Sequence, residues 1–178
     1  MAFKEKTIDS RIVYEGPIFK IRKHTIEAVS GKISERDVLE HCGGAVMLAV
    51  KDDGKIIMEE QYRKPIDSVA LEIPAGKCEE GEDPLETARR ELREETGYSA
   101  SDVRHLISFN TSFGYSDEVL HIYICKGLTC GERDLDETED IDIKEFTADE
   151  LVDMVMNNEI SDAKTIIAIL YASMKNEI

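Results

Sequence analysis

The stretch Gly76–Tyr98 constrains the fold of this chain most strongly, because it predicts a loop followed by a helix with both ends marked. Asp83 is a favourable N-cap, Pro84 suits the first helical position, and Glu86 completes an Asp-x-x-Glu capping box. Gly97 can take the left-handed conformation that ends a helix. Between these ends, an apolar stripe at i, i+3 and i+7 consists of Leu85, Ala88 and Leu92.

Two acidic residues of the predicted helix are four positions apart. Glu91 and Glu95 therefore lie about 40° apart around the helix and project together. Like charges at this spacing repel each other by a few tenths of a kcal/mol. A hard divalent cation removes the conflict, because Mg²⁺ binds one or two carboxylates, water and substrate phosphate oxygens. The alternative is a solvated acidic face, with Glu86 and Arg90 as an ion pair.

The pattern of residue identities resembles the Nudix box. It consists of Gly76, five residues, Glu82, seven residues, and then Arg90-Glu91-Leu92-Arg93-Glu94-Glu95-Thr96-Gly97-Tyr98, with Tyr98 where an aliphatic residue is more usual. The resemblance implies an α/β/α sandwich with a mixed central sheet. It also implies hydrolysis of a nucleoside diphosphate linked to another group. Mg²⁺ is the implied cofactor, with Mn²⁺ as a substitute.

The same resemblance implies a role for several side chains. Glu91 and Glu95 would be metal ligands, together with the carbonyl of Ala75. Glu94 would reach a metal through water. Arg90 would orient a carboxylate of the box, with Glu82 as its partner.

Segments that flank the box resemble the ADP-ribose pyrophosphatase branch of the family. They are Gln61-Tyr62-Arg63-Lys64-Pro65, Leu71–Lys77 and Ser116-Asp117-Glu118. In that branch the counterparts of Arg63 and Glu72 contact substrate, and we assign Asp117 and Glu118 to the same role. Without the flanking motifs, Arg63 would be a surface ion pair and Glu72 a strand-edge charge. The match implies that ADP-ribose is split into AMP and ribose 5-phosphate.

An acidic loop, Asp136–Ile141, also resembles this branch, in which a glutamate of the loop serves as general base or extra metal ligand. Glu137 and Glu139 are both candidates for the base, and Glu139 is also a candidate metal ligand. The alternatives are a solvated turn and a loose calcium loop. The calcium loop fails because no glycine follows at the required place.

Phe113 departs from the branch, which usually has proline at this position. Phenylalanine cannot fix the loop as proline would, although its ring could stack on a base or sugar. Tyr115 could stack a second nucleobase. Other nucleotide sugars and dinucleoside polyphosphates therefore stay open as substrates. A non-catalytic nucleotide-sensing module is the alternative from another class, but such modules typically lose the box glutamates that this chain retains.

Composition narrows the set of partners. The net charge of −16 argues against nucleic acid held through its phosphates. No apolar run approaches the roughly 20 residues of a transmembrane helix, and the start of the sequence has no hydrophobic signal core. The four cysteines form no C-x-x-C pair, so we expect them to be reduced in a cytoplasmic protein.

Residues 1–41 predict a small antiparallel β-meander, with strands at Thr7–Tyr14, Ile18–Val29 and Ile33–His41. The meander has little apolar mass, so we expect it to act as a dimerisation arm in a homodimer. Tyr14 or Phe19 could cover a bound adenine, or both rings could pack inside the meander.

Residues 42–178 are predicted to form the catalytic α/β domain. Its expected strands are Gly43–Val50, Lys55–Tyr62, Val69–Ile73, Val103–Phe109, Glu118–Gly127 and Ile141–Phe146. A capping box at Thr147–Glu150 predicts a second helix, and Ser161 or Asp162 would cap a third.

Overall fold

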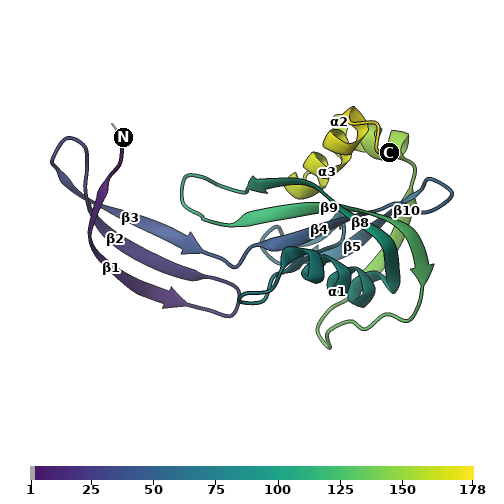
Figure 1. Cartoon of the computed structure of the whole chain (residues 1–178), viewed down its shortest axis with the longest axis horizontal. Helices are drawn as coiled ribbons and strands as arrows, with labels where there is room; N and C mark the ends of the chain where they lie inside the picture. Colours follow the sequence, from purple (N-terminus) through teal and green to yellow (C-terminus); the bar gives the residue numbers. More distant parts are fainter. Residues whose placement is uncertain (1–2) are drawn as a thin grey trace. The chain divides into compact units, whose positions relative to one another are not determined.

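A three-stranded antiparallel meander begins the chain in the structure, a computed structural model that describes residues 3–178. Its strands are β1 (Lys6–Glu15), β2 (Lys20–Glu27) and β3 (Ile33–Glu40), in the order β1-β2-β3 (Figure 1). The predicted meander is therefore confirmed. Every residue of β1 is exposed, so this sheet buries little of its own apolar surface. The rings of Tyr14 and Phe19 pack together, with their centroids 5.5 Å apart.

The chain divides into two compact units. The first comprises the residues up to Gly43 together with Phe109–Val119, and the second comprises Gly44–Ser108 and Leu120–Ile178. Backbone hydrogen bonds attach the second segment of the first unit to β3. The N–H of Leu39 donates to the Tyr115 carbonyl at 2.7 Å, and the N–H of Asp117 donates to the Leu39 carbonyl at 3.1 Å. Residues 109–119 thus belong with the meander, in addition to the predicted residues 1–41.

Two sheets form the second unit. One is mixed, in the order β7-β4-β9-β8, where β4 (Gly44–Ala49) runs parallel to β9 (Val119–Cys130) and antiparallel to β7 (Ala75–Lys77). The other is antiparallel and consists of β10 (Ile141–Phe146), β5 (Ile56–Arg63) and β6 (Ser68–Glu72). These sheets confirm the predicted mixed α/β fold.

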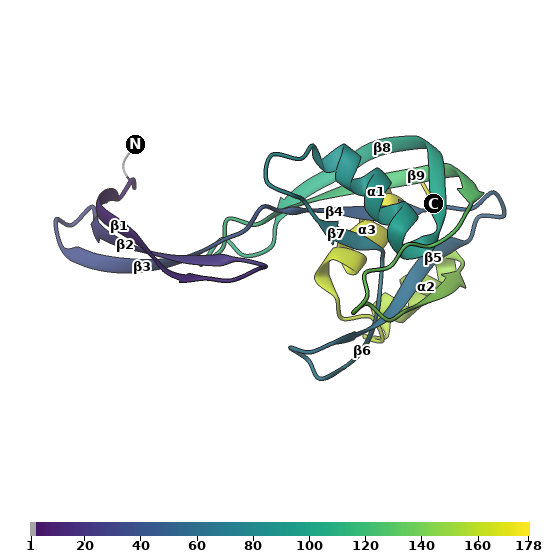
Figure 2. The same cartoon turned by 90° about the horizontal axis from the view of Figure 1, so that it is seen from below.

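Three helices cover the sheets. Helix α1 (Pro84–Thr96) lies on one side, and α2 (Ala148–Met156) and α3 (Ala163–Met174) lie on the other (Figures 1 and 2). Within residues 3–178, no helix is both long and apolar enough to cross a membrane.

The helix ends follow the sequence signals with one difference. Asp83 caps α1 by accepting the Leu85 N–H at 2.9 Å, and Gly97 takes a φ of 77° after its last turn. The predicted capping box is incomplete. Asp83 caps the helix alone, and the Glu86 carboxylate lies 3.9 Å from Arg89 instead. The complete capping box occurs at α2, between Thr147 and Glu150. Asp162, rather than Ser161, caps α3.

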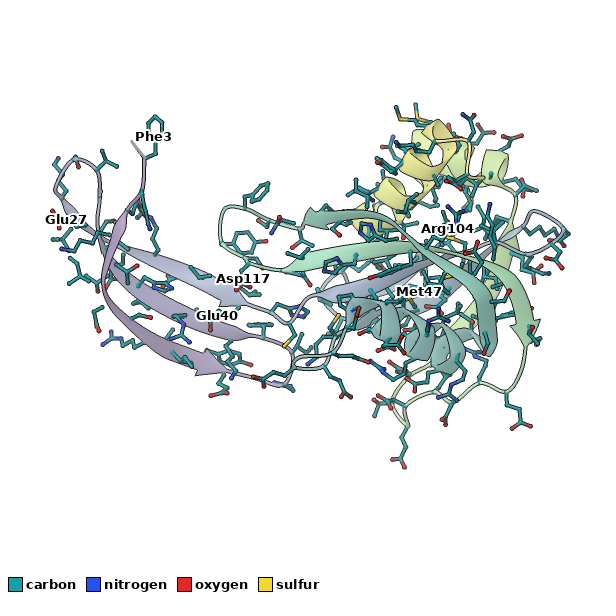
Figure 3. All side chains as sticks on the ribbon, in the orientation of Figure 1. Phe3, Glu27, Glu40, Met47, Arg104 and Asp117 are labelled. Carbon is teal, nitrogen blue, oxygen red and sulfur yellow. The ribbon has the colours of Figure 1, made fainter. Side chains whose placement is uncertain are left out.

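A core cluster fixes α1 on the sheet. Ala88 and Leu92 of the helix share it with Met47 of β4, Ile57 of β5 and Tyr123 of β9, and Met47 is labelled in Figure 3. Full burial of each large apolar side chain contributes about 1.5–3 kcal/mol. The buried stripe therefore sets the rotation of α1, and with it the direction in which its glutamates project.

Two strands differ from the expected ones. β8 (Tyr98–Asn110) begins directly after Gly97, because the left-handed glycine turns the chain straight from helix to strand. β7 was expected to be a loop, but Ala75 and Gly76 pair with Val46 and Ala45 of β4. The pairing brings the Ala75 backbone under α1, which packs on β7.

Candidate active site

Glu95 lies in an enclosed part of the site. It lies on the helical face that carries the core residue Leu92, and only 6% of its surface is exposed. Its carboxylate accepts a hydrogen bond from the backbone N–H of Ala75. Its Oε2 atom is buried without a hydrogen-bond partner among the described residues. A buried unpaired oxygen of this kind is costly, so it calls for a ligand or a proton.

The charges of other carboxylates act on Glu95. Burial raises the pKa of Glu95, and the negative charges of Glu59, Glu91 and Glu139 raise it further. Burial also raises the pKa of Glu91, although Arg90 opposes the shift. Two of the three charges that act on Glu95 belong to predicted site residues, Glu91 and Glu139, and the third belongs to Glu59, which was not predicted.

Arg90 connects three acidic residues. Its Nε and Nη2 donate to both oxygens of Glu82 at 3.1 Å, and its Nη1 donates to Glu91 at 2.7 Å and to Glu94 at 3.0 Å. The structure thus places the predicted partner Glu82 on Arg90, in place of an Arg90–Glu86 surface pair. Glu94 is held by Arg90 and Arg93.

The donor set fits a hard divalent cation. Carboxylate oxygens and the Ala75 carbonyl are the ligands that Mg²⁺ and Mn²⁺ prefer. In the described part of the chain, no three side chains of His, Cys, Asp or Glu converge as a ready-made cage. Such an ion would complete its coordination with the carbonyl, water and substrate oxygens, as Mg²⁺ commonly does.

A second polar group lies on β5 and β6. Arg63 donates through Nε and Nη2 to the two oxygens of Glu72, at 2.7 and 3.0 Å. Lys164 of α3 contacts the same carboxylate and also Asp162, at 3.0 Å from the latter. Burial opposes ionisation of Glu72, but Arg63 and Lys164 together bring its pKa below the usual value. Glu72 is 5% exposed, so it is a buried charge rather than a strand-edge one.

This group borders a cavity of about 430 Å³. Its walls include Arg63, Ile66, Ala70, Glu72, Asp162 and Lys164. The size lies within the range of small-molecule sites, and the mixture of apolar walls with a few charged groups is typical of them.

The two candidate bases in the acidic loop differ in their exposure. Glu139 is partly buried, accepts a hydrogen bond from the Asp136 N–H at 3.3 Å, and acts electrostatically on Glu91 and Glu95. Glu137 is exposed.

The remaining predicted substrate residues belong to the first unit. The Asp117 carboxylate, labelled in Figure 3, accepts the His41 N–H at 2.9 Å. The Glu118 carboxylate accepts the Thr111 hydroxyl at 2.7 Å and lies 3.3 Å from His41 Nδ1. Phe113 is 89% exposed, so its ring is free to contact a ligand. Asp117 and Glu118 therefore anchor their loop to the end of the meander.

Sequence reasoning missed three residues near these groups. Glu59 is 3% exposed, and its Oε1 has no hydrogen-bond partner among the described residues. The sequence signal that could have found Glu59 is its position, because this acidic residue directly follows the buried apolar run Ile56-Ile57-Met58. Lys164 follows the α3 cap and carries no local signal. Arg133 donates to the carbonyls of Glu95, at 2.6 Å, and Ile141, at 2.9 Å.

Two features define the class of this protein. A helix that carries several glutamates packs on a mixed sheet, and an antiparallel meander precedes both. The chain belongs to the Nudix family: the NUDIX domain matches residues 41–168, and the nucleoside diphosphate sugar hydrolase N-terminal domain matches residues 5–39.

Several known proteins are similar to this chain in sequence or in fold. The methanol dehydrogenase activator of Bacillus methanolicus is 42% identical over 99% of this chain and 96% of that protein. The ADP-ribose pyrophosphatase of Bacillus subtilis is 40% identical over 99% of this chain and 97% of that protein. A crystal structure of ADP compounds hydrolase has the same fold, with a TM-score of 0.85, 19% identity, and coverage of 98% of this chain and 95% of that one.

Proposed function

We propose that this Nudix hydrolase cleaves ADP-ribose to AMP and ribose 5-phosphate with the help of Mg²⁺ or Mn²⁺. The observation that carries the proposal is the buried, unpartnered carboxylate oxygen of Glu95 beside Glu91 and the Ala75 backbone. The 40% identity to an ADP-ribose pyrophosphatase along the whole chain supports the choice of substrate.

In this reaction the side chains of the protein would hold the metal ion in place and provide a general base. When bound by Glu91, Glu95 and the Ala75 carbonyl, the divalent cation would neutralise phosphate charge and lower the pKa of water. Arg90 holds the Glu91 carboxylate, and the Ala75 N–H orients that of Glu95.

Glu139 is our preferred base because its charge acts on both of those carboxylates, with exposed Glu137 as the alternative. The base takes a proton from water as the water oxygen bonds to one phosphorus. The bond from that phosphorus to the bridging oxygen then breaks, and the second phosphate leaves with the bridging oxygen.

Arg63 and Glu72 are proposed to bind the substrate beside the cavity. Glu72 fixes two nitrogens of Arg63, so the planar guanidinium is preorganised for a phosphate or ribose oxygen. Phe113, Asp117 and Glu118 are proposed to contribute further contacts, with the exposed Phe113 ring stacking on base or sugar.

We propose a homodimer with the meander as its dimerisation arm. Large apolar side chains exposed on the meander support this: Ile8, Ile12, Val13, Ile18, Val29 and Ile33. An exposed apolar surface of this kind marks an interaction site, and two-fold pairing is the commonest oligomer form. None of the four cysteines forms a disulfide within the described residues, and we propose that they stay reduced in a cytoplasmic protein.

A panel of diphosphates tests the substrate. ADP-ribose, GDP-mannose, other nucleotide sugars and dinucleoside polyphosphates are incubated with the protein and Mg²⁺, and the products are separated by chromatography. We expect ADP-ribose to give AMP and ribose 5-phosphate with the highest kcat/KM. A higher value for another nucleotide sugar or a dinucleoside polyphosphate would assign that substrate instead, and no turnover of any compound would favour a nucleotide-sensing module.

A second candidate is activation of a dehydrogenase, because the 42% identical relative bears the name methanol dehydrogenase activator. The test adds this protein to methanol dehydrogenase from Bacillus methanolicus and follows NADH formation. Activation that is lost in Glu95→Gln would tie the effect to hydrolysis, whereas activation retained in that variant would indicate a binding role.

A further inference from the structure

We propose that Glu59 of β5 joins Glu95 of α1 in holding one hard divalent cation. The inference rests on the metal site proposed for Glu91 and Glu95, but it does not depend on which diphosphate is cleaved. It assigns a ligand role to a residue outside the box.

The fold brings these two side chains together. Ile57 and Glu59 are two residues apart on β5, so they project from the same face of the strand. Ile57 belongs to the core cluster that contains Leu92 of α1. Leu92 and Glu95 are one turn apart on the same stripe of the helix. Glu59 and Glu95 therefore each lie one step beyond a member of this shared cluster, and Glu59 is the charge that acts most strongly on Glu95.

Both carboxylates are buried and incompletely bonded. Glu59 is 3% exposed and Glu95 is 6% exposed. The Oε1 of Glu59 and the Oε2 of Glu95 each lack a hydrogen-bond partner among the described residues. An unsatisfied buried polar atom costs about 1–3 kcal/mol, and more when it is charged. Two such atoms, on elements that share one core cluster, point to a ligand that both could bind.

The protein's own cations in this region have other partners. Arg133 donates to the backbone carbonyls of Glu95 and Ile141, while Arg63 and Lys164 bind Glu72. Their charges act on Glu59, but its Oε1 has no hydrogen-bond partner among the described residues. A divalent cation would supply both the missing charge and the missing contacts, and carboxylate oxygens suit Mg²⁺ and Mn²⁺.

Mn²⁺ binding to the metal-free full chain, without substrate, tests the assignment. Free Mn²⁺ is followed by electron paramagnetic resonance in wild type, Glu59→Gln and Glu60→Gln. Glutamine keeps the size of the side chain and can still hydrogen-bond, but it removes the charge. Glu60 is the matched control, because it projects from the opposite face of β5, is 43% exposed and lies 3.4 Å from Lys144.

We expect Glu59→Gln to weaken Mn²⁺ binding at least tenfold, in line with the losses seen when groups at a metal site are removed. Glu60→Gln should stay within about twofold of wild type, since exposed ion pairs contribute little. If Glu59→Gln binds Mn²⁺ with wild-type affinity, the role of Glu59 is wrong, but the proposed function is unaffected. Absence of Mn²⁺ binding in wild type would overturn the metal site itself, and with it the proposed function.

Thermal unfolding gives a second readout. Mn²⁺ should raise the Tm of wild type, because a ligand that binds only the folded state stabilises it. In Glu59→Val, which removes the unpartnered carboxylate from a buried strand, the metal-free Tm should equal or exceed that of wild type, and the Mn²⁺-induced rise should shrink. A lower metal-free Tm with an unchanged rise would show that Glu59 serves folding, and the inference would then be wrong.

Discussion

Gly76 lies so close to the Glu91 carboxylate that a β-carbon at residue 76 would overlap the Cγ, Cδ and Oε1 atoms of that glutamate. The backbone of Gly76 cannot easily retreat, because it is paired with Ala45 in the sheet. Arg90 holds the same Glu91 oxygen at 2.7 Å. The φ angle of Gly76 is not in the left-handed region, so space rather than backbone freedom requires glycine here.

Gly76→Ala should therefore displace the Glu91 carboxylate while leaving the core intact. Because a misplacement of about 1 Å in an active site can cost about 10²-fold in rate, we expect kcat to fall on that order. The measurement is steady-state hydrolysis, with circular dichroism to verify folding. Gly114→Ala is the matched control, since a β-carbon at residue 114 meets open space at an ordinary φ. Equal rates for the two variants would contradict this explanation.

Glu95→Gln keeps the shape of the side chain and removes its charge. Turnover at saturating Mg²⁺ should fall on the order of 10²-fold or more, because the cation that stabilises the transition state loses a ligand. Glu86→Gln, on the exposed side of the same helix, should change the rate little. Near-normal turnover of Glu95→Gln would remove Glu95 from the metal site.

Lys164→Met tests the partly buried cation that sequence reasoning missed. Lys164 contacts Glu72 and Asp162, so its loss leaves Arg63 as the main partner of the Glu72 carboxylate. We expect KM to rise about tenfold, the effect of losing roughly 1.4 kcal/mol of binding, with kcat within about threefold. Lys175→Met, at the other end of α3, is the control. A fall in kcat with an unchanged KM would mean that Lys164 acts on the reaction rather than on binding.

The Glu82–Arg90 pair predicts a stability that depends on pH. The hydrogen bonds from Arg90 and from the Glu79 N–H lower the pKa of Glu82 to about 2. Because the folded-state pKa lies below the unfolded value near 4.5, the contribution is complete above about pH 4.5 and is lost as pH falls towards 2.

Glu82→Gln should therefore lower the Tm at pH 6, and the difference from wild type should narrow below about pH 4.5. Circular dichroism melts at pH 6, 4.5 and 3.5 measure the difference. The exposed neighbour Glu80 provides the control, since Glu80→Gln removes one negative charge from the same loop. A Tm difference that is constant over this pH range would contradict the assignment.

Deleting residues 1–40 should weaken both dimerisation and substrate binding. The meander exposes large apolar side chains that a second subunit would bury. Sedimentation measures the oligomeric state, and the Michaelis constant measures substrate binding. A truncated chain that stays folded, sediments as a dimer and keeps its Michaelis constant would rule out the dimerisation arm.

The helix and the box were predictable because their signals are local. Asp83 and Gly97 act on neighbouring backbone groups, and the spacing of Glu91 and Glu95 follows from the helical period alone. The role proposed for Glu59 depends on β5 and α1 sharing one core cluster, which no short window of sequence specifies. The contact of Lys164 with Glu72 joins positions far apart in the chain, so sequence reasoning did not find it.

The attachment of residues 109–119 to the meander escaped prediction for the same reason. It depends on Leu39 exchanging backbone hydrogen bonds with Tyr115 and Asp117. Backbone groups carry no residue-specific signal, so the strand at Ile33–His41 was predicted but its pairing with residues 109–119 was not.

The parallel pairing of β4 with β9 bears on how the chain folds during synthesis. β4 is buried throughout, yet Gly44 pairs with Leu120 and Ala49 with Cys125, which leave the ribosome much later. The β1-β2-β3 meander contains only neighbouring strands, so its loops close early. A nascent chain that stalls before β9 would therefore carry a finished meander beside an apolar strand with one open edge, the kind of segment that chaperones recognise.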